Sequence, residues 1–242
     1  KVEDRGYQFA DGVYEVVCLR DGKLLDEERH LDRLAYSLGE LAIAEPMSRP
    51  ALKLVMRETI RRNRLRNAIL YMQVSRGVAP RDHSFAQNLK SVLVMTVRPL
   101  SNDKRDTVRR HGIEVISVPD QRWARCDIKS ISLLPNVLAR QKARDAKVQE
   151  AWQIDEQGMV TEGAATNAWI VDTHGFLRTQ PAHGAILNGI VRQVLLQCAS
   201  DLGLKLKEEA FSLDEAKAAK EAFSTASTMA VFPVVSIDGT KI

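Results

Sequence analysis

The sequence predicts an α+β protein built from two lobes, and three observations lead to this prediction. Segments rich in β-branched residues, typical of strands, alternate with segments of helical spacing in both halves of the chain. The 242 residues suffice for two domains of ordinary size. A polar, charged stretch, "PLSNDKRD" at 99–106, divides them, as domain linkers often do. We therefore predict an N-terminal α/β domain over 1–100, a linker over 101–106 and a larger C-terminal domain over 107–242.

The N-terminal domain opens with strand pattern and then changes to helical spacing. "VYEVVCL" at 13–19 is rich in β-branched residues, and the Asp-Gly pair at 21–22 predicts a turn after it. Further on, Leu31, Leu34 and Leu38 fall on one helical face. The predicted elements are strands at 13–19 and 23–26, helices at 27–42 and 49–63, and strands at 68–77 and 91–100 joined by a polar loop at 77–90.

The C-terminal domain begins with the strand pattern "GIEVISV" and contains one clearly amphipathic helix, "NGIVRQVLLQCASDLGL". The turns "DEQG" and "DTHG" separate short strands. The predicted elements are a strand at 112–118, a helix at about 135–147, strands at 150–155 and 167–172, a helix at 188–204 and further strands within 221–237.

Composition narrows the classes of function. The net charge of +4 and the pI of about 9.0 make nucleic acid a partner to consider. The densest basic run is "RRNRLR" at 61–66. It falls at the C-terminal end of a predicted helix, where the helix dipole stabilises positive charges. It has no zinc finger or RNP-type aromatic motif beside it. We therefore expect no nucleic-acid partner, although a basic nucleic-acid-binding module stays open as an alternative from another class.

The cysteines and the hydropathy of the sequence indicate where in the cell the protein is expected to lie. Three cysteines, far apart and without CxxC spacing, are unlike a disulfide framework or a zinc site. No apolar run reaches the roughly 18 residues of a membrane helix. We expect a cytoplasmic protein with no metal and no membrane partner. The chain opens on Lys1 and ends at "SIDGTKI", so we also expect residues to be missing at both ends.

Lys129, in "RCDIKS" at 125–130, is the first candidate for chemistry. A lysine becomes a nucleophile when burial or a neighbouring cation lowers its pKa, and Arg122 and Arg125 lie just upstream. Local context alone favours the other interpretation, a charge exposed at the edge of an element. The choice therefore depends on which other residues accompany this lysine.

Four further features could accompany Lys129, although each has an ordinary structural explanation. Glu162 in "TEGAATN" ends a strand and could face a ring nitrogen, or be a turn residue. "ILNGIVR" at 186–192 starts a helix, whose unpaired N–H groups could bind phosphate. "STAST" at 224–228 offers hydroxyls, and Arg33 lies off the main leucine face of its helix.

Together these segments resemble the fold-type IV pyridoxal-phosphate enzymes, and most closely the D-amino acid aminotransferases. The resemblance spans nearly the whole chain, with the landmarks in the order and spacing of the family. The "DGVYE" and lysine segments are the most specific of them. The landmarks are "EDRGYQFADGVYEVV" at 3–17, "HLDRL" at 30–34, "PRDHSF" at 80–85, "RWARCDIKSISLL" at 122–134, "TEGAATN" at 161–167 and "LNGIVR" at 187–192.

The resemblance implies a two-lobed fold-type IV architecture and a role for each cofactor-binding residue. Lys129 would form the Schiff base with pyridoxal 5'-phosphate and then shuttle the proton between the substrate Cα and the cofactor C4′. Glu162 would keep the pyridine nitrogen protonated, so that the ring acts as an electron sink. The remaining implied cofactor ligands are Arg33, Ser227 and the main-chain N–H groups of Ile190 and Val191 for the phosphate, and Leu187 against the ring.

The resemblance also implies how a substrate carboxylate is held. Arg81 and His83, in "PRDH", match the carboxylate-binding pair of the D-amino acid enzymes, with Tyr14 as a third donor and Thr228 as a further candidate. In relatives this loop reaches into the neighbouring subunit's site, which implies a homodimer. The implied reaction is ping-pong transfer of an amino group between D-amino acids, such as D-alanine, and 2-oxo acids, such as 2-oxoglutarate.

The chain also departs from the family pattern. Ala164, Ala165 and Thr166 stand where relatives tend to carry serines, Val191 where a threonine is common, and Ala226 where a hydroxyl is expected. Each lost hydroxyl removes a hydrogen bond worth roughly 0.5–1.5 kcal/mol. We therefore expect weaker cofactor retention than in relatives. The alternative within the fold is a branched-chain L-amino-acid aminotransferase; an aminodeoxychorismate lyase fits the lysine segment less well.

Overall fold

The computed structural model describes residues 1–242, apart from the side chain of Lys104. The chain forms two compact units, each with its own sheet and helices, which confirms the predicted α+β class. The first unit contains Lys1–Ser101 together with Ile128–Leu133, and the second contains Asn102–Asp127 together with Leu134–Ile242. Residues 102–106, where we expected a linker, form the first half of a helix in the second unit.

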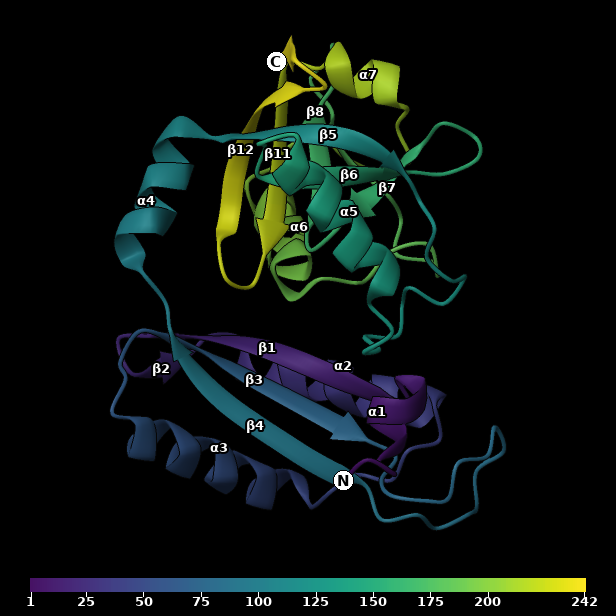
Figure 1. Cartoon of the computed structure of the whole chain (residues 1–242). Coiled ribbons are helices and arrows are strands. Elements are labelled where there is room, and N and C mark those ends of the chain that lie inside the picture. The colour runs from purple at the N-terminus through teal and green to yellow at the C-terminus, as the bar shows by residue number, and fades with distance from the viewer. The chain divides into compact units, whose positions relative to one another are not determined.

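The first unit is an antiparallel four-stranded sheet with the order β2-β1-β3-β4 (Figure 1). Its strands are β1 (Gly12–Arg20), β2 (Lys23–Leu24), β3 (Ala68–Ser75) and β4 (Val92–Pro99). Its helices are α1 (Arg5–Phe9), α2 (Glu27–Glu40) and α3 (Arg49–Asn63). The sequence predicted all of these except α1, which is five residues long and has no apolar periodicity.

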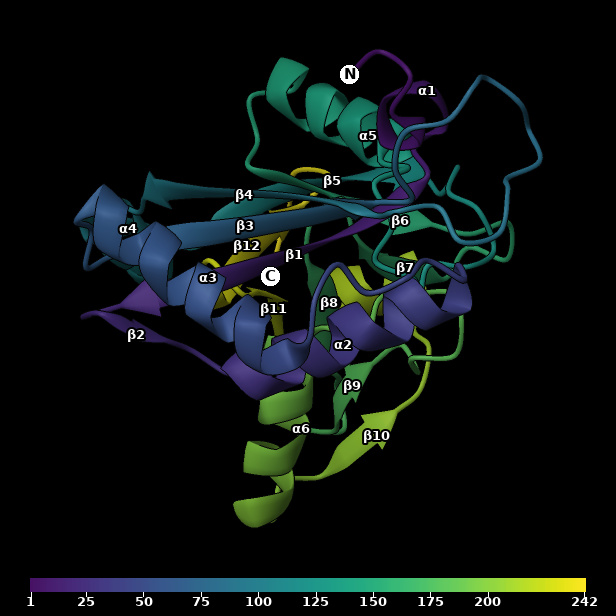
Figure 2. The same ribbon diagram turned by 90° about the horizontal axis from the view of Figure 1, so that it is seen from below.

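Both long helices of this unit cover the same face of the sheet (Figure 2). The predicted leucine face of α2 is buried, with Leu31, Leu34 and Leu38 no more than 3% exposed. These side chains share one core with alternate residues of β1 and β3, such as Val13 and Val74, as the two-residue period of a strand requires. Glu15 has the same parity as Val13, so its carboxylate points into this helix-covered face.

The segment 128–133 extends the sheet at the edge of β1. A bridge pairs Val13 with Ser130, and Ile131 donates a backbone hydrogen bond to Gly12. Ile128 is 4% exposed and packs into the core of the first unit. The predicted lysine segment is therefore tied to β1 by both its backbone and its flanking apolar side chain.

The second unit contains a mixed nine-stranded sheet in which β13 pairs with β12 and the other strands follow the order β10-β9-β8-β11-β12-β5-β6-β7. Its strands are β5 (Ile113–Pro119), β6 (Glu150–Ile154), β7 (Val160–Gly163), β8 (Asn167–Val171), β9 (Leu177–Thr179), β10 (Leu206–Glu208), β11 (Glu221–Ala226), β12 (Ala230–Ile237) and β13 (Thr240–Lys241). Its helices are α4 (Asn102–His111), α5 (Leu134–Asp145), α6 (Ile190–Asp201) and α7 (Leu213–Lys217).

This sheet must curl, because β7 and β8 lie far apart in the strand order but only residues 164–166 join them. The turn is closed by a 2.7 Å hydrogen bond from Gly163 N to Thr166 O. A Cβ on Gly163 would lie 2.0 Å from Thr166 Oγ1, so any other residue there would force the Thr166 side chain to move. The curl brings the end of β7 next to the start of β8, where two polar residues, Glu162 and Asn167, are buried.

The core of the second unit is aromatic at its centre. Trp152 and Phe211 are fully buried and meet edge to face, with ring centroids 6.3 Å apart. The indole N–H groups of Trp152 and Trp169 donate to the hydroxyls of Ser224 and Thr225. No helix among the described residues is long and apolar enough to cross a membrane.

Candidate active site

Lys129 is fixed by hydrogen bonds on both sides of its backbone. Its N–H donates to Ser37 Oγ on α2 at 3.2 Å, and its carbonyl accepts from Tyr14 N at 3.0 Å. The side chain is half-buried, and Nζ lies 4.2 Å from the centroid of the Tyr14 ring. The structure thus brings together two predicted site residues, the proposed nucleophile and a proposed substrate ligand. Lys129 is not the fully solvated charge that local sequence context favoured.

Arg33 lies in a buried cluster that the sequence analysis did not identify. Its Nε and Nη2 donate to the two carboxylate oxygens of Glu15 at 2.8 and 2.9 Å, and His30 Nδ1 lies 2.7 Å from Glu15 Oε2. Glu15 is fully buried and His30 is 2% exposed. Burial alone would raise the pKa of Glu15, but the charge of Arg33 and the hydrogen bond with His30 outweigh it and lower the pKa to about 2. Glu15 is thus an anion that orients Arg33.

Arg81 and His83 lie on the exposed loop between β3 and β4. Both contact Phe9 of α1: the guanidinium carbon of Arg81 is 5.0 Å from the ring centroid, and the His83 ring is 5.5 Å away. The described residues show no hydrogen bond or ring contact between this pair and Tyr14. The structure therefore brings Arg81 and His83 together, but not with the third predicted carboxylate donor.

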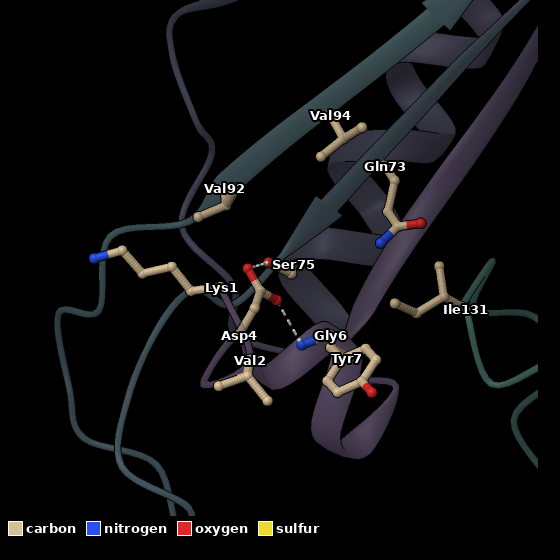
Figure 3. Close-up of a pocket in the computed structure, with 10 residues that line it drawn as sticks. All are labelled: Lys1, Val2, Asp4, Gly6, Tyr7, Gln73, Ser75, Val92, Val94 and Ile131. Atoms are coloured by element: carbon tan, nitrogen blue, oxygen red, sulfur yellow. Dashed lines mark hydrogen bonds between the residues drawn. The ribbon is translucent and has the colours of Figure 1, made fainter.

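A separate pocket of about 770 Å³ lies on the Tyr14-bearing face of the first sheet (Figure 3). Alternate residues of β3 and β4, including Gln73 and Val94, form its floor, and the N-terminal segment closes one side. Asp4 there accepts hydrogen bonds from Gly6 N at 2.8 Å and Ser75 Oγ at 3.1 Å. No predicted site residue is among the described residues that line this pocket, so we do not assign it to the candidate site.

Glu162 ends β7 and is 6% exposed. Its carboxylate forms a hydrogen-bonded ion pair with Arg122 Nη1 and accepts from Asn167 Nδ2 at 2.9 Å. Leu187 N donates to the same carboxylate at 3.2 Å. Two predicted cofactor residues, Glu162 and Leu187, therefore meet in the second unit, where a buried carboxylate is surrounded by three donors.

Arg122 and Arg125, considered above as cations that could lower the pKa of Lys129, are each engaged with a carboxylate. Arg122 Nη2 binds Asp120 at 2.6 Å as well as pairing with Glu162, and Arg125 binds Asp127 at 2.8 Å. Burial opposes the charge on Arg122, but the hydrogen bond to Asp120 and the charge of Glu162 outweigh it and raise its pKa. Arg122 therefore forms ion pairs with both Asp120 and Glu162 within the second unit.

Helix α6 begins at the predicted phosphate site. Gly189 is its N-cap, and Ile190 and Val191 are the first two helical residues, so their N–H groups have no acceptor within the helix. A Cβ on Gly189 would lie 2.1 Å from Asn167 Oδ1. Asn167 also donates to Leu187 O at 2.9 Å. The helix start, Leu187 and Glu162 are therefore connected through one amide side chain.

Ser227 and Thr228 lie in the turn between β11 and β12, closed by a 3.1 Å hydrogen bond from Met229 N to Ala226 O. Their neighbours Ser224 and Thr225 are buried acceptors for tryptophan N–H groups. In the "STAST" segment, Ser224 and Thr225 therefore have structural hydroxyls, whereas Ser227 and Thr228 lie at a half-buried turn.

The residues that the sequence analysis missed are polar partners: the buried Glu15, His30 and Asn167, and the half-buried Asp120. Glu15 carried a signal, since a charged residue inside an apolar strand must find an opposite charge. Its partner could not be inferred, because Arg33 lies on a different element. Asn167 carried no comparable signal in "TEGAATN".

Comparison with known proteins settles the family. A family model described as amino-transferase class IV matches residues 12–237. A D-alanine aminotransferase of Bacillus licheniformis is 40% identical over 241 residues, which cover the whole of this chain and 84% of that protein. The chain belongs to the class IV aminotransferases. A second relative, the D-alanine aminotransferase of Listeria monocytogenes serotype 4b (strain F2365), is 38% identical and 83% covered.

Solved structures agree on the fold of this class IV aminotransferase and confirm the predicted fold-type IV architecture. The branched-chain amino acid aminotransferase of Escherichia coli matches with a TM-score of 0.89 and 22% identity, over 100% of this chain and 82% of that one. The PLP-bound form of a hypothetical aminotransferase from Mycobacterium tuberculosis matches with a TM-score of 0.87 and 20% identity, over 100% and 86% of the two chains. At such identities the likeness concerns the fold alone.

Proposed function

We propose that this class IV aminotransferase is a pyridoxal-phosphate enzyme that moves the amino group between D-amino acids, such as D-alanine, and 2-oxo acids, such as 2-oxoglutarate. The observation that carries this proposal is its full-length similarity, at 36–40% identity, to several D-alanine aminotransferases. The Arg81 and His83 pair supports the same substrate class, because an arginine and a histidine can together hold a carboxylate.

The available donors fit the chemistry of pyridoxal phosphate. The group carries an aldehyde, a basic ring nitrogen and a phosphate, and Lys129, Glu162 and Arg33 offer an amine, a buried carboxylate and a guanidinium to these three parts. The start of α6 adds main-chain N–H donors. Gly189, its N-cap, lies so close to Asn167 that a Cβ there would overlap the Asn167 side chain. When bound, the cofactor supplies an electron sink for the bonds at the substrate Cα.

Two residues of the chain would then have separate chemical roles. Lys129 would hold the cofactor covalently through Nζ and, once released by the substrate amine, move a proton at the substrate Cα. Glu162, paired with Arg122, would hold the proton on the ring nitrogen.

The remaining cofactor and substrate contacts complete the proposal. Arg33, Ser227 and the N–H groups of Ile190 and Val191 would bind the phosphate, and Leu187 would pack against the ring. Proposed carboxylate ligands of the substrate are Arg81, His83, Tyr14 and Thr228.

We also propose a homodimer, because the resemblance to the D-amino acid aminotransferases implies that the loop with Arg81 and His83 is shared between subunits. A cytoplasmic location is supported by the cysteine usage, three residues without paired spacing. Sedimentation at micromolar concentration tests the dimer.

A visible absorbance spectrum tests the proposed reaction. Purified protein with added pyridoxal phosphate should absorb in the visible range, and the band should disappear on adding D-alanine. Lys129→Ala should abolish the response. A band that responds to L-valine or L-leucine but not to D-alanine would instead support the branched-chain alternative. The absence of any band would contradict the role of Lys129.

A further inference from the structure

A buried arginine outside the proposed site holds the loop that carries Arg81 and His83. Arg5, on α1, is only 3% exposed. Its Nη1 donates to the carbonyls of Asp82 and Ser84 at 2.6 and 3.3 Å, and its Nη2 donates to the carbonyl of His83 at 3.2 Å. One guanidinium therefore binds three consecutive backbone carbonyls. These bonds fix the main chain at His83 and at the residues directly before and after it.

This interaction supplies what the loop lacks by itself. Residues 80–90 belong to neither a helix nor a strand, and the side chains of 81–84 are exposed. Within the loop, Ser84 N donates to Asp82 Oδ1 at 3.0 Å. A guanidinium presents five donors in one rigid plane, so binding three carbonyls fixes the direction of the backbone more tightly than a single flexible donor could.

Phe9, at the other end of α1, contacts the loop side chains directly. Its ring lies 5.5 Å from the His83 ring, with the planes inclined by 51°. The guanidinium carbon of Arg81 lies 5.0 Å from the same ring centroid, within the range of a cation–π interaction. The helix thus holds the backbone of the loop through Arg5 and both proposed carboxylate ligands through Phe9.

Helix α1 is itself anchored to the end of β3. Arg5 N donates to Gly77 O at 2.8 Å. Asp11 accepts from Arg5 Nε and Arg76 Nε, both at 2.8 Å. Burial would raise the pKa of Asp11, but the hydrogen bonds from Arg76 and Arg5 outweigh it and lower the pKa. A Cβ on Gly6 would lie 2.8 Å from the Cβ of Ser75, so the helix packs too closely for any other residue. The helix is therefore a rigid support.

We propose that Arg5 is a positioning residue for substrate binding, and this rests on the proposed function of Arg81 and His83. By fixing the carbonyls of residues 82–84, Arg5 determines where the two side chains meet the substrate carboxylate. The hydrogen bonds from Arg5 go to backbone carbonyls and not to side chains of the loop. Substrate preference in this chain is therefore set partly by a residue of α1 that does not touch the substrate.

Arg5→Lys is the informative variant, because it keeps the charge beside Asp11 and removes the planar set of donors. In the enzyme loaded with cofactor, we expect the KM for D-alanine and for 2-oxoglutarate to rise between roughly 10- and 100-fold. We expect kcat to change much less, since the loop binds substrate and transition state alike. The preference for D-alanine over D-alaninol, which lacks the carboxylate, should fall in parallel.

Two further measurements separate positioning from general destabilisation. Arg178→Lys is the matched control: Arg178 is 9% exposed and also binds a carboxylate, Glu215, and a carbonyl, that of Ala210, but it lies in the second unit. It should leave both KM values unchanged. Hydrogen exchange in the cofactor-free protein should become faster at residues 82–86 in Arg5→Lys and remain unchanged there in Arg178→Lys.

The outcomes distinguish this proposal from the proposed function. Unchanged KM values in Arg5→Lys would overturn the positioning role, provided that Arg81→Ala raises them. An equal rise in Arg178→Lys would overturn it as well. If the parent protein shows no transamination, or if Arg81→Ala leaves both KM values unchanged, the proposed role of the loop fails. Unaltered hydrogen exchange in Arg5→Lys would refute the anchoring itself.

Discussion

The carboxylate of Glu15 binds the guanidinium of Arg33 through both of its oxygens, at 2.8 and 2.9 Å. Glu15→Gln leaves a buried guanidinium without its anion, and breaking a buried pair in this way costs about 3–5 kcal/mol. We expect a loss of this size in the free energy of unfolding, measured by urea titration. Glu58→Gln is the control, since Glu58 pairs with exposed arginines on α3 and should matter little. Equal losses in the two variants would contradict the prediction.

The same carboxyl predicts a pH dependence. Folding lowers the pKa of Glu15 from 4.5 to about 2. Such a group adds stability that is fully present above its unfolded pKa and is lost as the pH falls through its folded pKa. The melting temperature of the parent protein should therefore fall more steeply than that of Glu15→Gln between pH 4.5 and 2. Parallel curves in this range would show that Glu15 is not stabilised as an anion.

The strands and long helices could be predicted because their cause is local. The leucine spacing of α2 and the β-branched run of β1 each specify one buried face. Residues 101–106 were interpreted as a linker because "SNDKRD" is polar, although 102–106 form the first half of α4, which runs to His111. Helix α1 was missed because its five residues are fixed by Asp4 and by contacts with β3 rather than by any periodicity.

The site was predicted as separate motifs, and its supporting contacts were not. Sequence could indicate Lys129 because the lysine segment is specific to the family, and Glu162 because its segment follows in the family's order and spacing, although "TEG" alone is not specific. It could not indicate that Asn167 links Glu162 to Leu187, since that link arises from the curl of the sheet between β7 and β8. Non-local pairing of this kind has no signature within one segment of sequence.

Glu162→Gln should lower kcat for D-alanine by about 10²–10³-fold, the usual effect of removing one electrostatic partner of a reacting group. Glu150→Gln is a matched control, because Glu150 is equally buried, lies on β6 of the same sheet and pairs with Arg140. Burial already raises the pKa of Glu150, and the charge of Arg140 only partly opposes this. Its variant should retain nearly all of kcat. Comparable losses in both variants would argue against a chemical role for Glu162.

Val191→Thr should tighten binding of the cofactor. A hydroxyl at the second residue of α6 would add one hydrogen bond to the phosphate, worth roughly 0.5–1.5 kcal/mol. Titration of cofactor-free protein with pyridoxal phosphate should show a corresponding fall in Kd. Val194→Thr places the same hydroxyl nearly one turn further along α6 and should leave Kd unchanged. Very tight binding by the parent protein would contradict the expectation of weak retention.

Gly189→Ala should impair both stability and kcat, because its Cβ would overlap Asn167 Oδ1 at 2.1 Å. Asn167 would have to move, and the carboxylate of Glu162 would lose a donor. Gly39→Ala is the contrasting variant, since a Cβ there meets nothing within 4 Å and the residue is helical. It should stabilise the protein by about 0.5–1 kcal/mol. Full activity of Gly189→Ala would contradict the proposed connection.

The return of residues 128–133 to the first unit has a consequence during synthesis. A ribosome releases the chain from its N-terminus, so the first unit remains incomplete until residue 133 has emerged, after β5 of the second unit has already been made. Until then, β1 beyond its short pairing with β2 presents an unpaired edge, the kind of backbone that recruits other strands. The lysine segment therefore also pairs with the start of this edge, at Gly12–Tyr14, and the first unit cannot be completed until part of the second has been synthesised.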